Sequence, residues 1–141
     1  MFTALVAFGV GALGSRPVTG QAGAPTVEEH ETVMTEIRPA FRALRTSLEG
    51  QDAEDVAKQA GTIAKLLVTV EAFWTARKAE DAIGFVQTAR EAASSIETAA
   101  QGKDLAAAGD GAKALGGQCG SCHDVYREEL PDGTYVLKED K

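Results

Sequence analysis

Apolar residues recur at alternating steps of three and four along four stretches of this 141-residue chain. An α-helix turns once in about 3.6 residues, so each series lines one face of a helix and turns that face toward a core. The clearest series has its inward positions at Val27, His30, Met34, Ile37, Phe41, Leu44 and Leu48. Little of the sequence has the strict alternation typical of strands, and the chain is therefore predicted to be all-α.

Turn-forming residues separate the predicted helices. Asp52 and Asp104 each follow a glycine by two residues and are expected to act as N-caps. The helices are expected at about residues 27–49, 53–76, 80–101 and 105–130. Short loops join antiparallel neighbours, which predicts an up-down-up-down four-helix bundle. The stretch TYVL at residues 134–137 is strand-like, but no pairing partner for it is evident.

The first residues are typical of a secretory signal. Residues 2–14 are apolar or small, and the run is too short for a transmembrane helix, which needs about 20 residues. Ala22-Gly23-Ala24 is a candidate cleavage site, although no basic residue precedes the apolar run. We predict a signal peptide at residues 1–24, one domain at residues 25–141, and export to the periplasm.

Residues 119–123 read Cys119-Gly120-Ser121-Cys122-His123, which is the C-x-x-C-H pattern of c-type haem attachment. The domain at residues 25–141 is therefore predicted to bind haem. Two thiols three residues apart emerge on one face of a helix, where both can add to the vinyl groups of one haem. The adjacent imidazole can then be directed at the iron. Cys119 and Cys122 are predicted to bind haem c covalently, with His123 as an axial ligand.

Other uses of this motif fit less well. A thioredoxin-type pair is expected beside a βαβ unit, which the sequence does not show. A structural zinc site needs about four ligands, whereas the whole chain has two cysteines and two histidines. A disulfide between Cys119 and Cys122 would constrain only one helical turn.

Met34 is the predicted distal axial ligand. In an antiparallel bundle, Met34 and His123 each lie about seven residues from the same end, or about 10 Å. His30 is the competing candidate, but it lies one helical turn nearer that end of the bundle, about 6 Å from the level of His123 along the bundle axis. We expect His30 to be a satisfied or partly exposed histidine near a helix start. Bis-histidine ligation and an open sixth position stay as alternatives.

Bulky side chains gather at the same end of the predicted bundle, whereas the opposite end is rich in alanine. Phe73 and Trp74 lie near the end of the predicted second helix and are expected to line the haem pocket. Ordinary filling of a core by aromatic residues is the alternative.

A four-helix bundle with CGSCHDVYR in its last helix resembles the cytochrome c′ family, the class II cytochromes c, over about residues 27–130. The resemblance implies the same haem roles for Cys119, Cys122 and His123. Tyr126 and Arg127 match the Tyr-Arg pair that follows the motif in the family and are candidate pocket residues. The family includes low-spin proteins with a methionine ligand from the first helix, and five-coordinate proteins that bind NO or CO.

The predicted function is periplasmic single-electron transfer through one haem c iron, with His/Met six-coordination. A five-coordinate NO- or CO-binding protein is the alternative. No enzymatic activity is expected, because His/Met ligation leaves no open position on the iron. The expected partners are periplasmic redox proteins, and a homodimer is compatible with the family. A formal net charge of −7 argues against nucleic acid as a partner.

Overall fold

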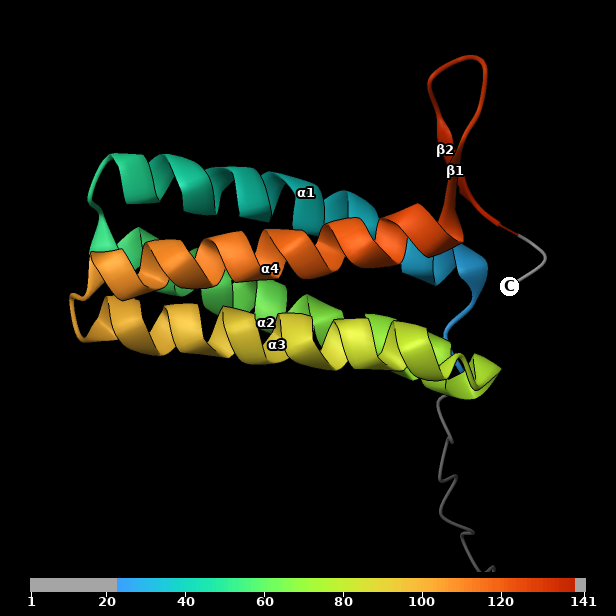
Figure 1. Ribbon diagram of the computed structural model, residues 1–141, viewed down its shortest axis with the longest axis horizontal. Helices are drawn as coiled ribbons and strands as arrows, with labels where there is room; N and C mark the ends of the chain where they lie inside the picture. The colour runs from blue at the N-terminus through green and yellow to red at the C-terminus, as the bar shows by residue number, and fades with distance from the viewer. Residues whose placement is uncertain (1–22, 139–141) are drawn as a thin grey trace, which may run out of the picture.

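The computed structural model describes residues 23–138 and shows four helices packed as a bundle (Figure 1). The helices are α1 (Val27–Glu49), α2 (Ala53–Arg77), α3 (Glu80–Gln101) and α4 (Leu105–Tyr126). They alternate in direction along the bundle, which confirms the predicted all-α, up-down-up-down fold. Most of the predicted signal peptide, residues 1–22, lies outside the described residues.

The helix starts follow the capping chemistry of the sequence. Thr26 and Glu29 form a capping box on α1, in which the Thr26 N–H donates to the Glu29 carboxylate at 2.7 Å. Asp52 and Asp104 cap α2 and α4 through their side chains, as predicted. α3 has no side-chain cap, since its N-cap residue is Ala79. In the turn before it Lys78 adopts the left-handed conformation at φ 57°, as Gln51 and Lys103 do in the other two turns.

The four helices do not pack equally against one another. α2 lies against α1 and α3, and α3 lies against α4, whereas α1 and α4 have little direct contact. At the end with the α1–α2 and α3–α4 loops, the core combines fully buried alanines, such as Ala60, Ala93 and Ala108, with larger side chains such as Leu44 and Ile96. The alanines let the helices approach closely there, whereas the buried aromatic residues of the core, Phe73, Trp74 and Tyr126, lie at the other end.

The prediction that the fourth helix continues to about residue 130 is wrong. α4 ends at Tyr126, and β1 (Arg127–Glu129) pairs antiparallel with β2 (Tyr135–Leu137). The Tyr126 carbonyl accepts a hydrogen bond from the Lys138 N–H at 2.9 Å, so the hairpin takes over the backbone pairing where the helix stops. The strand-like TYVL stretch thus has a partner in residues 127–129, which directly follow the end of α4.

The hairpin turn contains Pro131, Asp132 and Gly133. Proline disfavours helical geometry in the residue before it, and Gly133 supplies the positive φ of 80° that the turn requires. The hairpin projects from the end of the bundle at which α4 terminates (Figure 1). Within residues 23–138, no helix is both long and apolar enough to cross a membrane.

Candidate functional site

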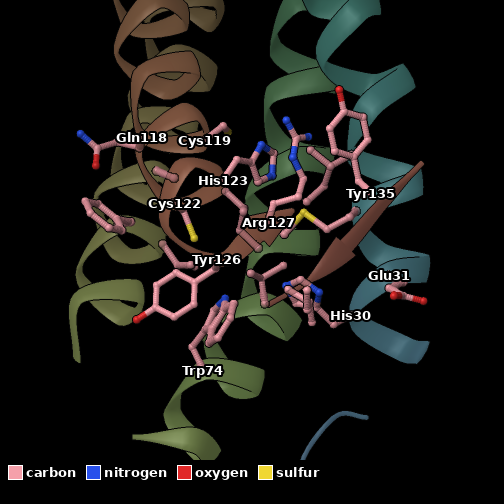
Figure 2. Close-up of a pocket in the computed structure, with 18 of the residues that line it drawn as sticks. His30, Glu31, Trp74, Gln118, Cys119, Cys122, His123, Tyr126, Arg127 and Tyr135 are labelled. Atoms are coloured by element: carbon pink, nitrogen blue, oxygen red, sulfur yellow. The ribbon is translucent and has the colours of Figure 1, made fainter. Parts of the chain in front are cut away.

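A cavity of about 240 Å³ lies at the hairpin end of the bundle, between α1 and α4 (Figure 2). Its walls are mainly apolar. Ile37 and Phe41 contribute from α1, Leu67 and Val70 from α2, and Val86 from α3. The cavity occupies the side of the bundle where α1 and α4 have little contact.

The motif residues Cys119, Cys122 and His123 form the α4 wall of this cavity. Cys122 is 9 % exposed, and the other two are half-buried. Burial raises the pKa of both thiols, and the charges of Cys119 and Asp81 help raise that of Cys122 to about 11. A redox-active C-x-x-C pair needs a lowered thiol pKa, so the site is unsuited to thiol–disulfide exchange.

The structure brings Met34 to the same cavity from the opposite wall. Met34 is half-buried in α1 and lines the cavity together with His123 of α4. Burial lowers the pKa of His123, which favours the neutral imidazole that metals bind. Axial ligation by Met34 stays a prediction, and its place in the cavity is what that prediction requires.

His30 lies in the cavity wall one turn before Met34. The expectation of a satisfied or partly exposed histidine is wrong, because His30 is 4 % exposed and neither ring nitrogen has a hydrogen-bond partner. Its ring lies 4.2 Å from that of Phe73 between centroids. Burial lowers the pKa of His30 to about 4, and the charges of Arg77 and His123 act in the same direction. Its place in the inward series of α1 was the sequence signal for this burial.

The two aromatic residues predicted for the pocket have different positions. Trp74 lines the cavity, is 3 % exposed, and has no partner for its Nε1 proton. Phe73 is not part of the cavity wall. It lies against the rings of His30 and Trp74, and the Arg77 guanidinium lies 3.5 Å over its face. Phe73 therefore packs against the ring of His30 outside the cavity wall.

Tyr126 and Arg127 both line the cavity where α4 meets the hairpin. The Arg127 guanidinium lies 3.9 Å from the ring centroid of Tyr135, a cation–π contact that joins the two strands. Tyr135, Val136 and Leu137 also line the cavity. These three residues were not predicted for the site from the sequence, although the Pro-Asp-Gly turn before them was a signal for a hairpin.

The residues present fit a c-type haem. One wall offers two thiols and an imidazole in the order that attachment requires, and the apolar walls suit the faces of a porphyrin. Among the side chains of residues 23–138, three buried polar atoms have no protein partner, namely the two ring nitrogens of His30 and Nε1 of Trp74. Leaving such an atom unsatisfied costs about 1–3 kcal/mol, so the cavity suits an occupant that carries polar groups or a metal.

Fold and site together define a four-helix protein that binds haem through a C-x-x-C-H motif. The sequence model of the family described as Cytochrome C' matches residues 25–127, and the chain belongs to this family. The family binds c-type haem with its iron and carries out electron transport. A search of curated proteins found no match to this chain. The family match ends at Arg127, so most of the hairpin lies beyond it.

Proposed function

We propose that the protein is a periplasmic carrier of single electrons and not an enzyme, with His123 and Met34 as the two axial ligands of its haem iron. One observation carries this proposal. His123 from α4 and Met34 from α1 face one apolar cavity from opposite walls. When bound, haem c supplies reversible one-electron chemistry at iron, and the protein sets its potential through ligands and burial.

Each residue then has a distinct part. Cys119 and Cys122 fix the cofactor to the helix that also carries His123, which limits the possible orientations of the imidazole. Met34 supplies a thioether, and a methionine opposite a histidine raises the reduction potential. Apolar walls and the hairpin limit the access of water to the cavity.

The charge of the chain indicates the kind of redox partner. With a formal net charge of −7, the protein is complementary to a redox protein that has a basic surface. Such complementarity mainly accelerates encounter and selects among partners. We therefore propose exchange of electrons with basic periplasmic proteins.

The second candidate is binding of NO or CO at an open sixth position. It is favoured by one observation, namely that Met34 is only half-buried while its neighbours on α1, Ile37 and Phe41, give the cavity an apolar surface. If Met34 turned away from the iron, these side chains would leave a distal face without a ligand.

Optical spectra of the holoprotein, with and without CO, test the proposal. We expect sharp, split visible bands in the ferrous state, no response to CO, and a ferric charge-transfer band typical of methionine–iron ligation. Met34→Leu should abolish that band. Val33→Ala, a half-buried neighbour outside the cavity wall, should keep it. A broad ferrous band that responds to CO would instead establish the second candidate.

A further inference from the structure

His30 is a buried imidazole, a side-chain type that can bind metals, and the proposed His/Met site has no use for it. It is 4 % exposed and lines the cavity, and both of its ring nitrogens lack partners. Such an arrangement is unusual, because buried polar groups in folded proteins are nearly always hydrogen-bonded. Because His30 lines the cavity, the cavity can supply the partner that the protein does not.

α1 presents His30 and Met34 to the cavity together. The two residues are four positions apart, so they lie one above the other on the same helix face. Figure 2 shows His30 pointing from α1 into the cavity, on the side opposite the motif residues of α4.

The other unpartnered group in the cavity is Trp74, whose indole nitrogen can only donate a hydrogen bond. An imidazole also has a lone pair, and its neutral form is a common metal ligand. Burial keeps His30 in that neutral form. Its ring lies 4.2 Å from Phe73 and 5.6 Å from Trp74 between centroids, so it has aromatic neighbours on two sides.

We propose that His30 is a second distal ligand, which binds the haem iron when Met34 leaves the sixth position. This inference rests on the proposed His/Met site. In the exchange, the thioether of Met34 leaves with its lone pair and an imidazole nitrogen of His30 donates its own. The bond to sulfur breaks and a bond to nitrogen forms, with no change in electron or proton count.

The exchange has a direction in redox terms. A methionine opposite a histidine raises the potential, and replacing it with a nitrogen ligand favours the oxidised iron. His30 ligation therefore gives the protein a second form with a lower reduction potential, built from two residues one helical turn apart.

The test compares ferric holoproteins by electron paramagnetic resonance and near-infrared spectra. Met34→Leu keeps the volume of the side chain but removes the thioether. We expect Met34→Leu to stay low-spin with the signature of two nitrogen ligands and to have a lower potential than the wild type. Adding His30→Phe, which keeps a ring against Phe73, should make the iron high-spin and strengthen binding of added imidazole at least tenfold. Met34→Leu with Glu31→Ala, another cavity residue, is the matched control and should stay low-spin.

The outcomes separate this inference from the proposed function. A wild type with methionine–iron ligation whose Met34→Leu variant is high-spin overturns the role of His30 and leaves the proposed function standing. A wild type that is high-spin without any substitution overturns the proposed function. A wild type with two nitrogen ligands, which loses them in His30→Phe alone, overturns both, since His30 would then be the first ligand.

Discussion

The Tyr126 hydroxyl donates a hydrogen bond to the carboxylate of Asp81, which joins the last turn of α4 to the first turn of α3. This hydrogen bond raises the pKa of Tyr126 to about 12, with burial and the negative charge of Asp81 acting in the same direction. The bond holds the end of α4 that carries His123 against the start of α3.

Tyr126→Phe should lower the free energy of unfolding by about 1 kcal/mol, the typical net value of a hydrogen bond. An unfolded tyrosine titrates near pH 10 and the folded Tyr126 near pH 12. Its stabilising contribution is therefore complete below about pH 10 and lost as the pH rises toward 12. Urea denaturation at neutral and alkaline pH measures both effects.

The matched control for Tyr126→Phe is Tyr135→Phe, since Tyr135 is 42 % exposed and keeps its ring under Arg127 after the change. It should leave the neutral-pH stability nearly unchanged. An alkaline loss of stability that is equal in the wild type and in Tyr126→Phe would contradict this role of the hydroxyl.

Replacing Cys122 with Ser should leave the haem attached by a single thioether at Cys119, and the haem should stay with the chain in a denaturing gel. Replacing both cysteines should let acidified organic solvent extract it. Mass spectrometry distinguishes the three states. Ser121→Ala, an exposed change inside the motif, should keep full attachment, and its loss of haem would show that more than the two thiols is required.

Two glycines of α4 should respond in opposite directions to alanine. A Cβ at Gly111 would lie 2.7 Å from Cγ1 of Ile96, whereas a Cβ at Gly109 would meet nothing within 4 Å. Gly111→Ala should destabilise the protein by about 1–3 kcal/mol through overpacking. Gly109→Ala should stabilise it by up to about 1 kcal/mol through helix propensity. Thermal unfolding of the two holoproteins measures the difference, and equal shifts would show that α3 and α4 are not closely packed there.

Ending the chain after Glu129 removes β2 and with it three cavity-lining residues, Tyr135, Val136 and Leu137. We expect a lower reduction potential, because exposure of haem to water favours the charged, oxidised iron. Thermal stability should change little, since among the helices the hairpin packs mainly on α4. Potentiometry checks the expectation, with Thr134→Ala in the exposed turn as control. An unchanged potential would show that the hairpin does not shield the cofactor.

The bundle was predictable because each helix carries its own signal. Inward residues recur with the helical period, and Asp52 and Asp104 are local caps that need no distant partner. The haem attachment motif is equally local. The start of the third helix was less certain, because the preceding turn contains no glycine or proline and Ala79 cannot cap the helix with a side chain.

The hairpin and the state of His30 depend on contacts that a single helix pattern does not contain. Cys122, Tyr126 and Leu130 are spaced four residues apart, so the sequence favoured one more turn of the fourth helix. The pairing of residues 127–129 with residues 135–137 replaces that turn. The periodicity of α1 turns His30 inward, yet its lack of partners follows from what α2 offers it, namely the aromatic rings of Phe73 and Trp74, neither of which hydrogen-bonds to it.

The scant contact between α1 and α4 has a consequence for how the cofactor enters. α1 packs mainly along α2, and the short turn at residues 50–52 connects the two. We therefore expect haem to enter on the side between α1 and α4, because the fewest helix contacts have to break there before it reaches Cys119 and Cys122.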